Sequence, residues 1–443
     1  MKIGVASLGC AKNLVDTEIV LGFLADAGHE IVSDPNQAEI IIVNTCGFIT
    51  EAKEESIETI LEMAALKETG RCRGLVVMGC LSQRYSQELW KEIPEIDALL
   101  GTDELDLVPE VIKRIAGGER VLERRGRHFD YNRNFARLST TGSHLAYLKI
   151  AEGCSHSCAF CVIPQIRGEY RSRTPESILA EARQLAAAGV KELAVIAQDT
   201  TAYGRDIGTS ILELLRELAC LDIPWIRLLY TYPTSISEEL LNLIASAPNV
   251  VKYIDLPLQH VSENVLRRMK RPGSFASTVS LVNRIRELIP GVVIRSSFIV
   301  GFPGETEEDF QELLKFLDGM RLDHVGIFKY SREENSAAYS LRGQVPETVK
   351  ERRWSEAMAL QQRISADLNQ RLVGRNLQVL IEHLSSESEL VMVGRHSGQA
   401  PEVDGVVYLG RGELRPGELV TVRITDAQAY DLVGEVVEGV EPA

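Results

Sequence analysis

The chain has 443 residues, of which 45% are hydrophobic and 25% are charged, a globular balance with room for two or three domains. Its apolar runs fall short of the roughly 18 residues that a membrane span needs. The opening MKIGVASLGC has no cationic segment ahead of an apolar one, so we expect a cytoplasmic protein without a signal peptide. The net charge of −15 disfavours nucleic acid as a partner unless a local basic patch overrides it.

The first part of the chain alternates strand and helix patterns. The expected elements are strands at residues 2–8, 38–44 and 75–79, with helices at about 13–27 and 50–68. Strands separated by helices are typical of a parallel sheet. We therefore predict an N-terminal parallel α/β sheet domain over residues 1–117.

Residues 118–140 interrupt this alternation and are rich in arginine. Six arginines stand against three acids, a local charge of +3. The arginines are Arg120, Arg124, Arg125, Arg127, Arg133 and Arg137. We interpret the segment as a linker, and the alternative is that it lines a substrate entrance.

Residues 141–372 repeat a strand followed by a helix six times. The strands are expected near residues 145–150, 192–197, 225–230, 252–257, 292–300 and 323–328. Six units are fewer than the eight of a closed barrel, so we predict a central open (β/α)6 partial barrel with a side slot. Over residues 373–443, short alternating segments separated by glycine and proline predict a small antiparallel β-barrel of about five strands. The fold class is thus α/β with a C-terminal β module.

Cys154, Cys158 and Cys161 form a CxxxCxxC motif after the first predicted barrel strand. Eight cysteines in a chain of a reducing compartment indicate metal ligands or catalytic groups rather than disulfides. Three thiolates suit an iron–sulfur cluster and leave one of four irons open. Zinc would normally need a fourth ligand. His156 lies within the loop, so a zinc site is the alternative.

A second set of cysteines shares one position relative to its strands. Cys10, Cys46 and Cys80 each lie just past the carboxyl end of a predicted parallel strand, which is the edge where ligands bind in open α/β sheets. Single buried cysteines are common as small apolar residues, but three in equivalent places favour a second metal cluster. Cys72 and Cys220 lack this placement.

The CxxxCxxC motif, with Phe160 before its last cysteine, resembles that of the radical S-adenosylmethionine superfamily. The resemblance implies that S-adenosylmethionine binds the open iron of a 4Fe-4S cluster, and that one electron from the cluster generates a radical from it. An electron donor is a further implied partner. The resemblance also implies cofactor contacts from Gln198 and Asp199 after the second strand, and from Gly301 and Gly304 after the fifth. The two glycines have an alternative explanation as a tight strand-to-helix turn.

The three predicted parts together resemble the methylthiotransferases, whose C-terminal module is called TRAM. Shared motifs are Asn13 with Asp16-Thr17-Glu18, Leu258-Gln259-His260, Met269-Lys270-Arg271 and Gly301-Phe302-Pro303-Gly304-Glu305-Thr306. The resemblance implies two 4Fe-4S clusters, the second of which carries the transferred sulfur. It also implies that one S-adenosylmethionine supplies the methyl group and another the radical.

The methylthiotransferase family has two substrate classes, an adenosine in tRNA and the β-carbon of an aspartate in small-subunit ribosomal protein twelve. The opening Ser7-Leu-Gly-Cys10-Ala-Lys-Asn13 resembles the second branch, because the tRNA branch usually has Gln-Met where this chain has Ala11 and Lys12. Residues 374–440 hold five basic and eleven acidic residues, a charge of −6, which suits a basic protein better than phosphates.

We therefore expect an enzyme whose partner is the basic ribosomal protein or the assembled small subunit, without tRNA or membrane. The alternatives are a tRNA adenosine methylthiotransferase and, from another class, an iron–sulfur or zinc binding module without catalysis.

Overall fold

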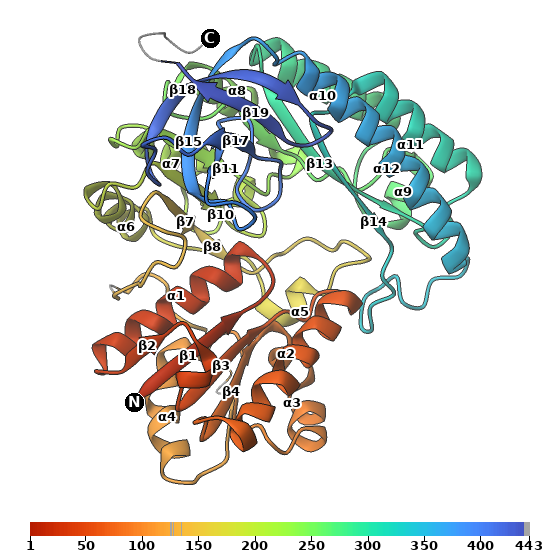
Figure 1. The fold of residues 1–443 in the computed structure, drawn as a ribbon. Coiled ribbons are helices and arrows are strands. Elements are labelled where there is room, and N and C mark those ends of the chain that lie inside the picture. The colour runs from red at the N-terminus through yellow and green to blue at the C-terminus, as the bar shows by residue number, and fades with distance from the viewer. Residues whose placement is uncertain (125, 127, 134, 438–443) are drawn as a thin grey trace.

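The computed structural model describes residues 1–124, 126, 128–133 and 135–437, so Arg125 and Arg127 of the expected linker lie outside the described residues. Figure 1 shows the red and orange N-terminal sheet at one end of the molecule and the blue C-terminal strands at the other, with the barrel strands between them. Within the described part of the chain, no helix is both long and apolar enough to cross a membrane.

The N-terminal part is a parallel sheet with the strand order β2-β1-β3-β4-β5-β6. Its elements are β1 (Lys2–Ser7), α1 (Ala11–Asp26), β2 (Glu30–Val32), β3 (Ile40–Thr45), α2 (Thr50–Thr69), β4 (Gly74–Gly79), α3 (Cys80–Glu92), β5 (Ala98–Leu100), α4 (Val108–Ala116) and β6 (Val121–Glu123). This confirms the predicted parallel sheet. Pairing of β6 with β5 also carries the sheet into the segment expected as a linker.

Both faces of this sheet are buried, because successive side chains of each strand point to opposite faces. Ile40 and Ile42 of β3 pack with α1 and α4 in one core. Ile41 and Val43 pack with α2 and α3 in the other. Helices on both faces explain why these strands are continuous apolar runs.

The central part is an open partial barrel made of two parallel three-stranded sheets, β7-β10-β11 and β12-β13-β14. A bridge between Ile226 and Val250 joins the two sheets. The elements are β7 (Leu145–Lys149), β8 (Ala151–Glu152), α5 (Ile163–Arg167), β9 (Arg171–Ser172), α6 (Pro175–Ala187), β10 (Glu192–Ile196), α7 (Ile211–Leu218), β11 (Trp225–Leu228), α8 (Glu238–Ser246), β12 (Tyr253–Asp255), α9 (Glu263–Arg268), α10 (Phe275–Leu288), β13 (Val293–Val300), α11 (Glu307–Met320), β14 (His324–Lys329) and α12 (Glu347–Gln370). The six expected barrel strands are confirmed.

The C-terminal part is a closed barrel in the order β15-β16-β17-β19-β18. Its strands are β15 (Asn376–Leu384), β16 (Val391–His396), β17 (Val407–Gly410), β18 (Leu419–Ala427) and β19 (Leu432–Val436). The neighbouring pairs are antiparallel except β17 with β19, which are parallel. A ring with an odd number of strands cannot alternate direction all the way round, so one parallel pair is required.

Ion pairs fix the C-terminal barrel to the amino ends of the central strands. Glu192, the first residue of β10, accepts hydrogen bonds of 2.6 Å from Arg227 and from Arg395 of β16. Tyr253, the first residue of β12, donates to Asp404 at 2.6 Å. His324, the first residue of β14, lies 2.9 Å from the Gly398 carbonyl oxygen. The small barrel therefore covers the end of the central barrel where its strands begin.

Candidate active site

Three cysteines lie at the carboxyl edge of the N-terminal sheet. Cys10 directly precedes α1, Cys46 directly follows β3, and Cys80 is the first residue of α3 after β4. Gly9, with φ +87°, turns the chain between β1 and Cys10, and a Cβ built on it would lie 2.8 Å from the Cys46 Cβ. The Cys80 thiol donates to the Asn13 side-chain oxygen at 3.6 Å. These contacts bring the ends of three separate strands together, as the strand positions predict.

The CxxxCxxC segment forms a loop between β8 and α5. The Cys154 amide donates to the Gly168 carbonyl at 3.1 Å, and the Cys161 amide donates to the Cys158 carbonyl at 3.1 Å. Arg271 donates to the Cys158 sulfur at 3.5 Å. The loop is thus closed on itself and tied to the segment after α9.

Both sets of three cysteines line one cavity of about 350 Å³. From the N-terminal part it receives Cys10, Lys12, Asn13, Cys46, Phe48 and Cys80, and from the barrel Cys154, Cys158, Cys161, Arg167, Gln198, Tyr230, Tyr232, Gln259 and Arg271. The barrel residues lie at or beyond the carboxyl ends of its strands. The cavity therefore forms where the ligand-binding edges of two separate sheets face each other.

Burial dominates the acidity of most of these thiols. It raises the pKa of Cys154 to about 11 and the pKa values of Cys80 and Cys161 to about 12, and it also raises the pKa of Cys46. At Cys10, burial acts in the same direction, but the nearby Lys12 and Arg167 outweigh it and the pKa is lowered. A thiol has to lose its proton before it binds a metal. Because burial disfavours the charged thiolate, the positive charge of bound iron has to stabilise it.

The described side chains contain no group of three His, Cys, Asp or Glu residues that converges on a single metal ion. An iron–sulfur cluster needs thiolates spread around it, one on each of three irons, and the zinc alternative needs ligands gathered on one ion. His156, the fourth ligand of that alternative, has its Nε2 atom 2.7 Å from Asp199 and its ring stacked on Tyr232 at 3.9 Å.

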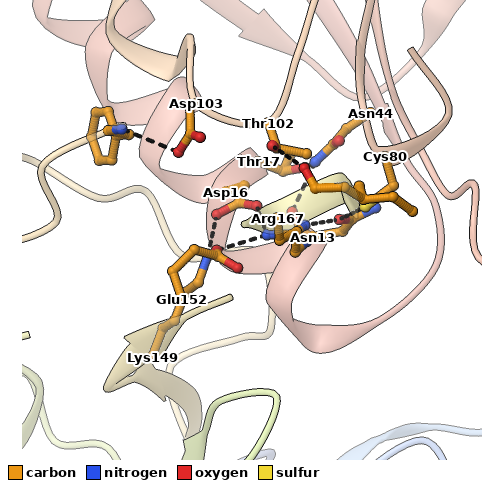
Figure 2. Close-up of polar contacts among 12 residues, drawn as sticks. Asn13, Asp16, Thr17, Asn44, Cys80, Thr102, Asp103, Lys149, Glu152 and Arg167 are labelled. Carbon is orange, nitrogen blue, oxygen red and sulfur yellow. Dashed lines mark hydrogen bonds and ion pairs between the residues drawn. The ribbon is translucent and has the colours of Figure 1, made fainter. Parts of the chain in front are cut away.

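A buried ion network connects the two parts beside the cavity (Figure 2). Arg167 of α5 donates to Asp16 of α1 at 3.1 Å, to Glu152 at 2.7 Å and to the Asn13 side chain. Lys149, the last residue of β7, also donates to Asp16, at 2.7 Å, and pairs with Glu152. Because Asn13 accepts from Cys80, the network connects the N-terminal cysteines to the barrel.

Of the two residues expected to contact a cofactor after the second strand, Gln198 lines the cavity and Asp199 does not. Gln198 donates to Glu152 at 2.7 Å, while its Oε1 atom is buried without a partner among the described residues. Asp199 accepts from the Thr201 amide at 2.9 Å and the Thr201 hydroxyl at 2.5 Å and contacts His156. Its carboxylate therefore caps the turn that follows and holds His156.

Gly301 and Gly304 are not among the residues that line this cavity. A Cβ on Gly301 would lie 2.3 Å from the Lys350 side chain, and one on Gly304 would lie 2.5 Å from the Arg268 guanidinium. Both have positive φ, +76° and +84°, in the turn between β13 and α11, which favours glycine as the tight-turn alternative expects, and their contact with a cofactor stays a prediction.

Sequence reasoning did not single out Lys149, Glu152 or Arg167. The sequence did contain one hint, which is that charged residues stand in a stretch expected to be buried. Lys149 ends the apolar strand LAYLK, and Glu152 directly precedes Gly153-Cys154. Charged residues are rarely fully buried unless they are paired. The partners of these charges, however, come from distant parts of the chain.

Three family models match successive parts of this chain. The uncharacterized protein family UPF0004 matches residues 2–101, the radical SAM superfamily matches residues 148–317, and the TRAM domain matches residues 373–437. The curated relatives match along the whole chain. A "ribosomal protein uS12 methylthiotransferase RimO" of Geotalea uraniireducens is 50% identical over 440 residues, which cover 98% of both chains. A protein of the same name in Geobacter sulfurreducens is 49% identical over 440 residues, again 98% of both chains.

Among solved structures, the radical S-adenosylmethionine methyltransferase TsrM of Kitasatospora setae is similar in fold. The TM-score is 0.56 at 16% sequence identity, over 82% of this chain and 89% of that one.

Proposed function

Because the chain belongs to the RimO family of ribosomal protein uS12 methylthiotransferases, we propose that it adds a methylthio group to the β-carbon of an aspartate in that ribosomal protein. One observation carries the proposal: two separate sets of three cysteines face a single cavity. Methylthio transfer needs two metal centres close to one substrate carbon, and two cysteine triads on one cavity provide this. A binding module with a single cluster would not need the second triad.

In this proposal, Cys154, Cys158 and Cys161 hold the cluster that binds S-adenosylmethionine, and Cys10, Cys46 and Cys80 hold the second 4Fe-4S cluster. When bound, these groups supply the reducing electron, the radical, the sulfur and the methyl group. Arg271 donates to Cys158 and offsets thiolate charge there. The unpartnered Gln198 oxygen would accept a hydrogen bond from a donor group of the cofactor.

The acidic C-terminal barrel recognises a basic protein partner. Glu387, Glu389, Glu413 and Glu418 are all exposed, so their field reaches solvent and favours encounter with a ribosomal protein rich in lysine and arginine. Tight phosphate binding would need the opposite charge, which disfavours tRNA. An external electron donor, acting in the cytoplasm, completes the proposed system.

Mass spectrometry of the ribosomal protein from cells with and without this chain tests the proposal. We expect the methylthiolated aspartate only when the chain is present, and we expect its loss when Cys154, Cys158 and Cys161 are replaced by alanine. A methylthiolated adenosine in tRNA that appears only with this chain, beside an unmodified ribosomal protein, would establish the alternative substrate.

A further inference from the structure

Lys12 places a positive charge on the cavity between the two sets of cysteines. It is the second residue of α1 and only 8% exposed, and it lines the same cavity as the six cysteines. Its Nζ atom lies 3.1 Å from the centre of the Tyr230 ring. Across residues 1–124, 126, 128–133 and 135–437, no carboxylate forms an ion pair with it.

The other two cations of the cavity are already engaged. Arg167 is held by Asp16, Glu152 and Asn13. Arg271 donates to the Pro257 carbonyl at 2.8 Å and to the Cys158 sulfur at 3.5 Å. Arg271 also lies over an aromatic ring, that of Tyr232 at 4.4 Å, but its donors are used by the carbonyl and the sulfur. Lys12 lies near the Cys10 thiol and has no ion pair with a carboxylate among the described residues, so its ammonium is available to an entering carboxylate.

Tyr230 is held rigidly in the position that supports Lys12. Its φ of 59° is in the left-handed region that non-glycine residues rarely adopt. The Tyr230 amide donates to Asp255 at 2.8 Å, and its carbonyl accepts from the Thr200 amide at 2.9 Å. An unusual backbone conformation fixed by hydrogen bonds to β12 and to the turn after β10 is typical of functional sites.

A buried ammonium over an aromatic ring recovers only part of the hydration it has lost, and a carboxylate ligand can complete the pair. The proposed substrate carbon is bonded directly to a carboxyl group, so a contact to that carboxylate fixes the carbon one bond away. We propose that Lys12 binds the carboxylate of the target aspartate and selects it over neutral side chains. This inference rests on the proposed function and adds the residue that recognises the substrate.

Two peptides and two variants test the role of Lys12. The peptides carry either the target aspartate or asparagine at the same position, and the variants are Lys12→Met, of similar length without charge, and Lys12→Arg, which keeps the charge. Peptide affinity is measured by fluorescence anisotropy, and product is measured by mass spectrometry.

We expect the unmodified protein to bind the aspartate peptide about tenfold more tightly than the asparagine peptide, because a charge-assisted contact stabilises it. Lys12→Met should reduce this preference to about twofold or less, and Lys12→Arg should keep most of it.

Iron content and cleavage of S-adenosylmethionine without peptide separate this role from a structural one. Lys12 also lowers the pKa of Cys10, so both are expected unchanged in Lys12→Arg, which keeps the charge, and the peptide preference of Lys12→Met is compared at matched iron content. Equal weakening of both peptides, or loss of iron with an unchanged preference, would show that Lys12 only balances the thiolates and would overturn the inference. If the unmodified protein methylthiolates the aspartate peptide while Lys12→Met keeps its preference, only the assignment of Lys12 fails. If the unmodified protein yields no product, the proposed function fails as well.

Discussion

Arg167 is the residue on which the junction between the N-terminal sheet and the barrel depends. It comes from the short helix that follows the CxxxCxxC loop, yet two of its three partners lie in α1, more than a hundred residues earlier. Both carboxylates that it contacts are buried. Removal of the guanidinium would leave Lys149 paired with two buried carboxylates, Asp16 and Glu152. One buried negative charge would then be uncompensated, which is strongly destabilising.

We therefore expect Arg167→Met to lower the free energy of unfolding by about 3 kcal/mol, measured by urea denaturation with tryptophan fluorescence. The double variant Arg167→Met with Glu152→Gln should recover part of the loss, because it removes one uncompensated charge. Arg183→Met, at an exposed arginine on α6, is the matched control and should change stability little. A loss below about 1 kcal/mol for Arg167→Met would contradict the role assigned to this network.

Among single residues, the sequence singled out those whose place at the cavity follows from a local pattern. The six cysteines were found because each triad has a fixed relation to predicted strand ends or a fixed spacing. Arg167 and Lys149 were missed because their partners depend on how two sheets dock, and no local pattern encodes that docking. Lys12 was noticed only as a difference between two family branches, whereas its place beside Tyr230 required the structure.

The turn from β1 into α1 sets the distance between Cys10 and Cys46. Gly9→Ala would place a methyl group 2.8 Å from the Cys46 Cβ, so one of the two cysteines has to move. We expect the variant to hold about four irons per chain, as for one cluster, in place of about eight for two.

Gly28→Ala is the control for backbone strain at Gly9. Its φ is +79°, similar to that of Gly9, but its Cβ would meet nothing within 4 Å. This variant should lose stability without losing iron. Equal iron loss in both variants would show that backbone strain, not the contact with Cys46, is responsible.

The two cysteine triads should separate by role as well as by place. With Cys10, Cys46 and Cys80 replaced by alanine, we expect about half of the iron to remain. This variant should still cleave S-adenosylmethionine on reduction but form no methylthio product. Replacement of Cys154, Cys158 and Cys161 should abolish both activities and serves as the comparison. Loss of cleavage in the first variant, with the barrel cluster still bound, would refute this division of labour.

Most strands with a clear apolar pattern were predictable from the sequence, and the three-residue β12 was expected from the regular strand–helix repeat, whereas the 13-residue helix α3 and several short strands were not. Strands such as β3 and β13 carry clear apolar patterns, and the six barrel strands were expected close to where they occur. β2, β5 and β6 have three residues each, too few to show a periodicity of two. The direction of β19 relative to β17 was also missed, because it follows from the closure of the ring and not from the residues of either strand.

For the whole molecule, the buried ion cluster around Glu192 joins the C-terminal barrel to the central one. Burial would raise the pKa of Glu192, but Arg227 and Arg395 outweigh it and hold the pKa below its ordinary value of 4.5. A carboxyl group with a lowered pKa in the folded state contributes stability that is present above its unfolded pKa and is lost as the pH falls through its folded pKa.

We expect Glu192→Gln to be less stable than the unmodified protein by about 3 kcal/mol at pH 7, with a difference that shrinks as the pH falls below about 4.5. Urea denaturation over this pH range measures it. Glu217→Gln, at an exposed position on α7, controls for the general effect of acid. A difference that stays constant with pH would show that the Glu192 charge does not support the junction.

The charge of the C-terminal barrel should affect how fast the partner associates. Replacement of Glu387, Glu389, Glu413 and Glu418 by lysine should slow association with the ribosomal protein at low salt, and the effect should shrink as salt rises. Stopped-flow fluorescence measures the rate. The same charge change on α2, at the exposed Glu54, Glu58, Glu62 and Glu68, is the matched control. Equal slowing by both variants would assign the effect to net charge alone.

The position of the C-terminal barrel also limits the shape of any partner that it holds. It contacts the first residues of β10, β12 and β14, whereas the cavity lies past the ends of such strands. On β10, Glu192 contacts the C-terminal barrel and Gln198 lines the cavity six residues later, so the two sites are separated by roughly 20 Å at about 3.3 Å per residue. A partner bound at both needs its target on an extended segment about six residues or more from the anchored surface.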